Sequence, residues 1–342
     1  MKRLNAIILL SMATLSATAL AQAPDSARPG TLNYVEGSAA IANQSLDRAS
    51  IGSTELQPGQ IISTTNGKAE LLLTPGVFLR LGNNSAVKMV SPSLTNTEVE
   101  VLSGQASVEV DQLYKQNDLL VTINGEPTQL LKNGLYQFDA NANTVRVYDG
   151  KAAVFPNDNG DPNAKAVVVK GGRQFTLNKQ FGDPQKFDKN AAEANDSLYN
   201  WSSLRSEYVG GANAYLSNQY AGSAAFNPGW YWDSSLWGYT WLPGDGYFFN
   251  PFGWGFYSPA YFYGGGPLYG RYGRGIYYGR GYGYGGYGGR SYGYNRPGTG
   301  NVRGGTPIAR GGGFSGGGVR SGGSFSGGVG GGFHGGGGGG HR

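Results

Sequence analysis

The chain has 342 residues, of which 14% are charged, and its formal net charge is +5 at neutral pH. It contains no cysteine, which excludes a disulfide framework and thiolate chemistry, so the fold must be stabilised by a packed core. Its two histidines, His334 and His341, lie in a glycine-rich C-terminal segment. This position excludes a Ser-His-Asp arrangement or a histidine metal site from the part that can fold.

Residues 1–21 have the pattern of a secretory signal peptide. Lys2 and Arg3 precede an apolar run that ends in Ala19-Leu20-Ala21, an acceptable cleavage site. No later stretch approaches the roughly 18 consecutive apolar residues of a membrane-spanning helix. We therefore expect an exported protein that is periplasmic, cell-surface or secreted, and at most peripheral to a membrane.

The charges are divided unevenly along the chain. From Gly264 onward there are nine arginines and no acidic residue, whereas the part before it contains all 22 acidic residues and 18 basic ones. Without the signal peptide, the part before Gly264 therefore carries about six net negative charges. This division predicts an acidic folded part followed by a basic tail.

Between residues 59 and 85, turn dipeptides alternate with short apolar runs at strand spacing. Asn66-Gly67 favours a two-residue hairpin, because both central positions of a type I′ turn need positive φ, and Pro75-Gly76 predicts a second reversal. After the second turn, apolar residues alternate with Phe78 and Arg80, which indicates a strand with one face on a core. The inward-facing residues of this strand are Val77, Leu79 and Leu81.

Similar signals continue along residues 31–178, at roughly the 8- to 12-residue spacing of short-strand folds. The turns are expected at Gly104, Asn124-Gly125, Asn133-Gly134, Asp149-Gly150 and Gly171-Gly172. The intervals hold the alternating apolar residues Val99, Val101, Ala106, Val108, Val110, Leu119, Val121, Ile123, Tyr136, Phe138, Val145 and Val147. This pattern predicts a mainly β domain and fits a β-sandwich, a jelly roll or a β-solenoid.

The motif region resembles the signature of the FecR domain, an extracytoplasmic signalling module. The matching positions are Gly59, Ile61, Thr64, Gly67, Ala69, Leu71, Gly76, Leu79, Leu81 and Ser85. The resemblance covers about residues 31–178 and implies a twisted, solenoid-like stack of short strands with an interaction role. In that family, the domain typically belongs to a membrane-anchored regulator of a sigma factor, so a signalling or sensory setting is also implied.

Residues 183–211 change to a helical period. Ala194, Leu198, Trp201, Leu204 and Tyr208 fall on one side of a helix. Asn190 and Glu193 are spaced as a capping box at its start, and Gly210-Gly211 would end it. We expect this helix to lie across the β domain with Trp201 as its anchor, whereas a docking helix for a partner is the alternative.

Residues 228–263 form a tryptophan- and tyrosine-rich module that prolines divide into short pieces. Two interpretations remain open: a small aromatic core over the Trp201 helix, or exposed rings that stack on sugars. A turn at Asp233-Ser234-Ser235 is expected between two strands. The candidate binding residues are Trp230, Trp232, Trp237, Tyr239, Trp241 and Trp254.

Residues 264–342 have a low-complexity composition rich in Gly, Tyr, Arg and Ser, which predicts a disordered tail. Arginines in this tail can contact an anionic surface, whereas specific nucleic-acid binding is not expected of an exported chain. The candidate anion contacts are Arg271, Arg274, Arg280 and Arg290.

The predicted fold class is mainly β: a twisted β-solenoid or jelly-roll-like domain of short strands, then one helix, the aromatic module and the tail. We expect a non-enzymatic protein with no catalytic residue, cofactor or metal, acting in extracytoplasmic protein-protein interaction or signalling at the cell envelope. The alternative is a structural or adhesive surface or matrix protein that binds polysaccharide through exposed aromatics. The expected partner is an envelope protein or a polysaccharide.

Overall fold

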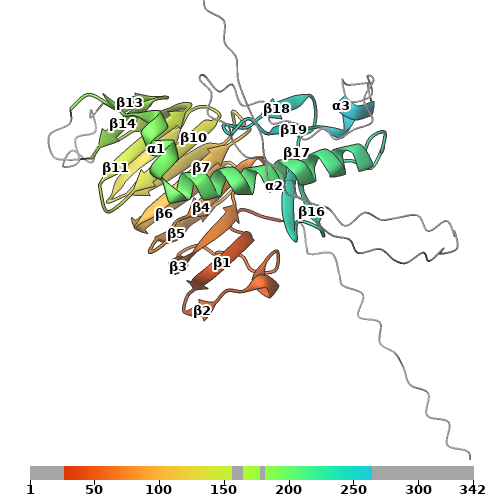
Figure 1. Ribbon diagram of the computed structural model, residues 1–342, viewed down its shortest axis with the longest axis horizontal. Coiled ribbons are helices and arrows are strands. Elements are labelled where there is room, and N and C mark those ends of the chain that lie inside the picture. The colour runs from red at the N-terminus through yellow and green to blue at the C-terminus, as the bar shows by residue number, and fades with distance from the viewer. Residues whose placement is uncertain (1–26, 156–164, 178–181, 264–342) are drawn as a thin grey trace, which may run out of the picture. The chain divides into compact units, whose positions relative to one another are not determined.

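The computed structural model describes residues 27–155, 165–177 and 182–263 (Figure 1). The expected signal peptide at 1–21 and the expected tail at 264–342, with its four candidate arginines, lie outside these residues. The fold class is confirmed, because the described part is mainly β with few helices.

A single sheet of 15 strands forms most of the described part. Its order is β13-β12-β9-β8-β6-β5-β3-β4-β7-β10-β11-β14-β15, with β1 paired to β3 and β2 paired to β1. The strands are β1 (Leu32–Ile41), β2 (Gln44–Ser45), β3 (Ile61–Leu72), β4 (Val77–Leu81), β5 (Ala86–Pro92), β6 (Asn96–Ser103), β7 (Gln105–Val110), β8 (Asp118–Ile123), β9 (Glu126–Leu130), β10 (Gly134–Asp139), β11 (Thr144–Asp149), β12 (Lys151–Val154), β13 (Val167–Lys170), β14 (Arg173–Thr176) and β15 (Gln185–Lys186).

Strand β3 joins the two halves of this sheet. Its first residues, Ile61–Ser63, pair with β5, whereas its last residues, Ala69–Leu72, pair with β4. The two halves enclose one hydrophobic core, to which both contribute their alternating aliphatic side chains. The alternation predicted for β4, β6, β7, β8, β10 and β11 is confirmed, because its apolar members are all buried.

The hairpin predicted at Asn66-Gly67 is wrong. Strand β3 runs through both residues, and Gly67 lies opposite Gly37 of β1 at an irregularity in the pairing. A Cβ atom at Gly67 would lie 2.5 Å from the backbone nitrogen of Ser38, so the glycine permits a close approach of two backbones.

Other turn predictions are confirmed. Pro75-Gly76 reverses the chain between β3 and β4, and Gly76 has φ +84°. Asn124-Gly125 joins β8 to β9 with positive φ at both residues, as a type I′ turn requires.

Two helices follow the sheet, α1 (Lys189–Asn195) and α2 (Ser197–Gln219). Their N-caps are Asp188 and Asp196, so Asn190 lies inside α1 rather than at its start. The predicted helix end at Gly210-Gly211 is wrong, because α2 continues for a further eight residues to Gln219. Close packing explains Gly210: a Cβ atom there would lie 3.2 Å from the Cβ atom of Trp254.

The buried face of α2 also differs from the predicted one. Leu198 and Trp201 are buried as expected, but Leu204 and Tyr208 are exposed. Polar residues take their place on the buried face: Ser202, Arg205, Ser206, Asn213 and Ser217. Across the three described ranges, no helix combines the length and the apolar character that crossing a membrane would require.

The aromatic module consists of two hairpins and a short helix. Strands β16 (Gly229–Asp233) and β17 (Gly238–Leu242) form one hairpin, and β18 (Tyr247–Phe249) and β19 (Gly255–Tyr257) form the other, followed by α3 (Pro259–Tyr263). The turn predicted after Asp233 is confirmed, because its carboxylate accepts hydrogen bonds from the backbone of Ser235 and Leu236.

Candidate interaction surface

Three fully buried charged residues lie on the outer face of the β3-β4-β7 region. Arg80 of β4 donates from Nε to Oε2 of Glu70 on β3 at 2.7 Å, and from Nη1 to Oε2 of Glu109 on β7. The three side chains come from neighbouring strands, since β4 pairs with both β3 and β7. Charges are stable in this environment only because they are paired.

Helix α2 completes this buried polar network. Arg205 donates from Nη2 to Oε1 of Glu70 at 2.9 Å, and Ser206 donates from Oγ to Glu109. The Arg205 guanidinium also lies 4.0 Å from the centre of the Tyr34 ring, a cation–π arrangement. The polar stripe of α2 therefore fixes the helix to the sheet at a defined position.

The network shifts the pKa of its carboxyl groups in opposite directions. Burial alone would raise the pKa of Glu70, but the charges of Arg205 and Arg80 and their hydrogen bonds outweigh it and lower this pKa to about 2. Asp111 is also fully buried, and burial followed by the adjacent Glu109 raises its pKa well above the ordinary value. Glu70 is therefore held charged and Asp111 is driven towards the neutral acid.

Three asparagines connect the aromatic module to the sheet and to α2. Asn33 of β1 accepts from the Tyr239 backbone N–H at 2.6 Å and donates to the Glu70 carboxylate at 2.8 Å. Asn250 donates to Oε1 of Glu109 at 2.8 Å, and Asn213 of α2 donates to the Trp241 carbonyl at 2.8 Å. The module is thus anchored to the same network that holds α2.

Five of the six candidate aromatic residues lie mostly within the molecule. Trp241 is 0% exposed and Tyr239 is 2% exposed, and both belong to a cluster with Phe78, Val209 and Phe256. Among the remaining candidates, three are half-buried: Trp230, Trp232 and Trp254. These rings therefore form a small aromatic core that packs against α2 and β4.

Trp237 is the exposed member of the set, with 40% of its surface accessible. Its backbone has φ +53°, an uncommon value for a large residue. Its Nε1 donates to the Arg48 carbonyl at 3.3 Å, its ring lies 4.8 Å from the Arg48 guanidinium, and Trp232 contacts it edge-on at 5.8 Å. The ring is therefore held in one orientation at the surface.

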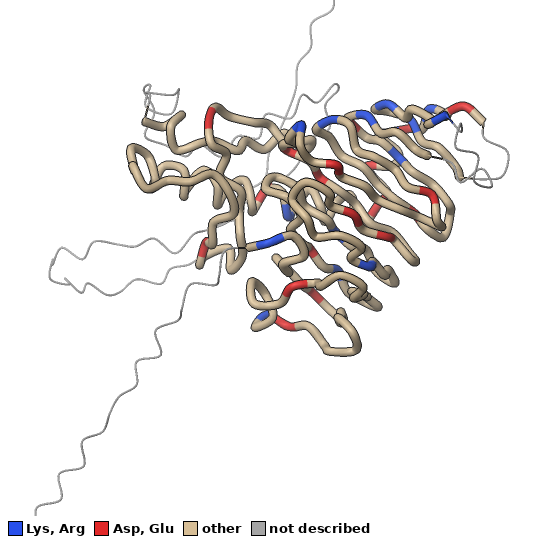
Figure 2. Tube along the Cα trace, turned by 180° about the vertical axis from the view of Figure 1, so that it is seen from behind, with Lys and Arg blue, Asp and Glu red and all other residues tan. Residues whose placement is uncertain are grey.

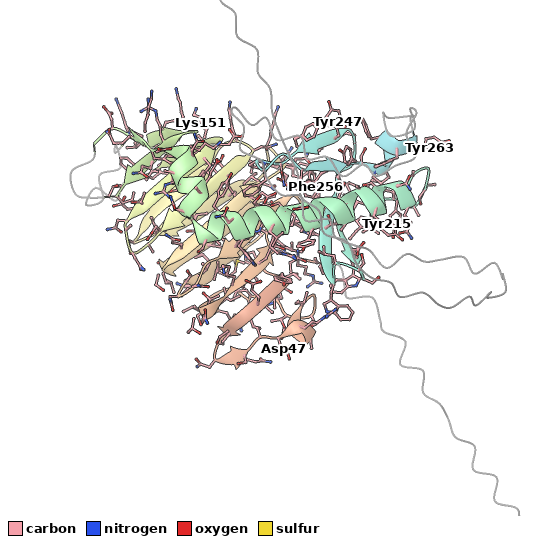
Figure 3. All side chains as sticks on the ribbon, in the orientation of Figure 1. Asp47, Lys151, Tyr215, Tyr247, Phe256 and Tyr263 are labelled. Atoms are coloured by element: carbon pink, nitrogen blue, oxygen red, sulfur yellow. The ribbon has the colours of Figure 1, made fainter. Side chains whose placement is uncertain are left out.

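A second set of surface rings lies on β18, β19 and α3, three of them exposed and two half-buried. We define the aromatic face as Tyr247, Phe249, Tyr257, Tyr261 and Tyr263. Phe249 is 59% exposed and Tyr263 is 77% exposed. Ring centres are 5.6 Å apart for Tyr247–Phe249, 5.2 Å for Tyr247–Tyr261 and 5.7 Å for Tyr257–Tyr261. Figure 3 shows Tyr247 and Tyr263 on the part of the module formed by β18 and α3.

The residues predicted from the sequence were five tryptophans and Tyr239, and none of them belongs to the aromatic face. The period of two in Tyr247 and Phe249, next to the glycine at 246, was a usable signal of a strand with one open side. The buried polar network was not predicted either. Its sequence signal was a charged residue, Arg80, within an apolar strand, with Glu70 and Glu109 in neighbouring strands.

No protein-family model and no curated protein matches the chain. Solved structures that match include two crystal structures, at 2.50 and 1.65 Å resolution, of a candidate anti-sigma factor from Parabacteroides distasonis. Their sequence identities are 18% and 17%, and the TM-score is 0.31 for both. Each match covers 39% of this chain and 62% of the other, so the chain spans about three fifths of the protein that it matches. The FecR resemblance itself stays a prediction.

Proposed function

We propose that this chain is an exported, non-enzymatic binding protein that acts in protein-protein interaction or signalling at the cell envelope. The observation that carries the proposal is the aromatic face. Three of its rings, Tyr247, Phe249 and Tyr263, are exposed, although the same module buries Trp241 and Tyr239 inside. Exposed aromatic patches on a folded protein mark interaction sites.

The residue types of the aromatic face and the hydrogen bonds that fix its hairpin both suit a binding role. Tyr and Phe are enriched at protein interfaces, because they bury a large area and lose little conformational freedom. Here the hairpin that carries Tyr247 and Phe249 is fixed by the Asn250–Glu109 hydrogen bond and by Asn213, which accepts from the Tyr257 N–H at 2.8 Å. A partner would therefore meet a preorganised surface, which reduces the entropy lost on binding.

The expected export supports a location outside the cytoplasm, and the FecR resemblance supports a signalling setting. Both come from the sequence. The aromatic face does not depend on either, so the binding role and the compartment are tested separately.

The binding role is tested by site-specific photocrosslinking in cells. A photoreactive residue at Phe249 is expected to yield a discrete crosslinked envelope protein, whereas the same residue at exposed Leu94, on the connection between β5 and β6, is expected to yield none. Excess wild-type chain should compete for the product, and excess Tyr247→Ser/Phe249→Ser chain should not. Equal crosslinking from both positions, or equal competition by both chains, would refute the proposal.

The exposure of the Trp237 ring favours a second candidate function, which is polysaccharide binding. Its strained backbone and its contact with Arg48 hold the indole in place, as a platform for a sugar ring requires. Under this function, a surface polysaccharide would quench or shift Trp237 fluorescence and Trp237→Phe would abolish the change. A Tyr247→Ser/Phe249→Ser chain would retain it.

A further inference from the structure

An open hollow of about 560 Å³ lies between the connection that follows β7 and the end of β9. Two exposed lysines, Lys115 and Lys132, line it together with the Tyr114 ring and the Asn117 amide. One acid, Asp118, also lines it, and its carboxylate accepts a hydrogen bond from Gln129 at 3.0 Å. The hollow therefore combines two cations, amide groups and one aromatic ring.

Further cations continue from the hollow along the same end of the sheet. The backbone N–H of Leu131, next to Lys132, donates to the Lys151 carbonyl at 2.8 Å, and Lys151 lies directly opposite Lys170 in the β12–β13 pairing. We define the basic ridge as Lys115, Lys132, Lys151, Lys170, Arg173 and Lys186.

The ridge turns around the Gly171-Gly172 connection. Beyond this turn, Arg173 lies directly opposite Lys186 in the β14–β15 pairing. Figure 2 shows basic segments gathered along one edge of the sheet, and Figure 3 shows Lys151 at that edge near β13.

These cations are not neutralised within the part of the chain that the structure describes. No described carboxylate lies within 4.0 Å of a ridge nitrogen, although Asp118 lines the hollow and the charge of Asp245 acts on the Tyr114 hydroxyl. Like charges directly opposite each other in a sheet are destabilising. The two cross-strand pairs, Lys151–Lys170 and Arg173–Lys186, therefore weaken the fold, which is expected where the charges serve a ligand.

We propose that the hollow and the basic ridge bind a linear acidic polysaccharide, with one acidic sugar unit in the hollow and the chain continuing along the ridge. Neighbouring strands place cations about 4.8 Å apart, which suits a polymer with a carboxylate on every unit. The Asn117 amide and the Tyr114 ring can meet the hydroxyl groups and the apolar face of a sugar.

Other polyanions fit this surface less well. A single-stranded nucleic acid is held by aromatic rings that stack on successive bases, whereas Tyr114 is the one aromatic residue lining the hollow. A bilayer surface is held by an apolar face inserted beside the cations, whereas of the leucines here Leu130 is buried and Leu113 and Leu131 are half-buried at the hollow. The proposal uses none of the residues of the aromatic face, so either site can fail alone.

Lysine footprinting on the full-length chain tests the proposal. No lysine follows Lys189, so modification of lysines reports on the folded part and not on the arginine-containing tail. At low ionic strength, a polygalacturonate oligomer is expected to protect Lys115, Lys132, Lys151 and Lys170 from acetylation. A neutral dextran oligomer of the same length should protect none of them.

The test variant is Lys115→Gln/Lys132→Gln, which removes the cations of the hollow. The polyuronate concentration that half-protects Lys151 and Lys170 is expected to rise about tenfold, as for the loss of one strong charge-assisted contact. The control is Lys68→Gln/Lys88→Gln, which removes the same charge from lysines paired with Glu36 and Glu100 at 3.7 and 3.4 Å. The control variant should give the wild-type value, and thermal melting should show both variants folded.

Three results would overturn the proposal. The first is equal protection of Lys68, Lys88 and the ridge lysines by polyuronate. The second is protection by oligothymidylate or by phosphatidylglycerol vesicles in the absence of any protection by polyuronate. The third is a folded Lys115→Gln/Lys132→Gln variant in which the polyuronate concentration that half-protects Lys151 and Lys170 equals the wild-type value.

Discussion

Arg80 and Glu70 form an ion pair in which Nε and Oε2 are 2.7 Å apart and both side chains are completely inaccessible to solvent. Glu109 contacts the same guanidinium, and Arg205 brings α2 to the same carboxylate. The pair therefore links the sheet to the helix and, through Asn33 and Asn250, to the module that carries the aromatic face.

Replacing Arg80 by Met is expected to lower the free energy of unfolding by about 3–5 kcal/mol at neutral pH, because it leaves buried carboxylates without their main cation. Urea denaturation measures the change. The matched control is Lys88→Met, which breaks the partly exposed Lys88–Glu100 pair at 3.4 Å and should cost about 1 kcal/mol or less. Similar losses in both variants would show that the Arg80 network does not stabilise the fold.

The low pKa of Glu70, about 2, predicts a contribution to acid unfolding. A carboxyl whose pKa falls on folding stabilises the protein above its ordinary pKa of about 4.5, and this stabilisation is lost as the pH falls towards 2. Stability curves at pH 5, 4, 3 and 2 should therefore descend less steeply in Glu70→Gln than in the wild type. Parallel curves would contradict the assignment.

The raised pKa of Asp111 predicts a pH dependence of stability opposite to that of Glu70. Its pKa rises on folding, so the folded state holds a proton that the unfolded chain releases, and stability falls as the pH rises above the ordinary pKa. Asp111→Asn removes this ionisation and is expected to raise the melting temperature at pH 7, with a smaller effect at pH 4. The control is the exposed Asp118→Asn variant, which should change the melting temperature at pH 7 by less than Asp111→Asn does. A lower melting temperature for Asp111→Asn at both pH values would argue against it.

The strands could be predicted from the sequence because one face of each strand is consistently apolar, as in Val99 and Val101 or Val145 and Val147. The burial of the charged outer face could not be predicted. Alternation predicts a solvent-facing Arg80, whereas Arg80 is fully buried in a network that Arg205 of α2 and Asn250 of the aromatic module complete. The predicted burial of Leu204 and Tyr208 was wrong because the buried face of α2 combines apolar residues such as Leu198 and Val209 with hydrogen-bonded polar ones such as Arg205.

Asn66-Gly67 failed for a different physical reason, which gives a prediction. The dipeptide has turn chemistry, but Gly67 is required by the approach of β1, where the Ser38 nitrogen would lie 2.5 Å from an added Cβ atom. Gly67→Ala is expected to destabilise the fold by about 2 kcal/mol or more, because backbone atoms rather than a flexible side chain must move. Gly182→Ala, where an added Cβ meets nothing within 4 Å, is the control and should be close to neutral. Comparable urea midpoints for the two variants would contradict this role of Gly67.

Tryptophan fluorescence tests whether the module is an aromatic core with one ring displayed. Trp241 is inaccessible and Trp201 is buried, whereas Trp237 is 40% exposed, so the native spectrum should be blue-shifted with a minor component that acrylamide quenches readily. Trp237→Phe is expected to remove most of that component and to leave the melting temperature nearly unchanged, since its ring contacts the molecule mainly through Arg48 and Trp232. Trp241→Phe should instead lower the melting temperature, because the ring is packed against Phe248 and Phe256. If acrylamide quenched the Trp237→Phe protein as strongly as the wild type, other tryptophans of the module would be open to solvent, which would contradict an aromatic core.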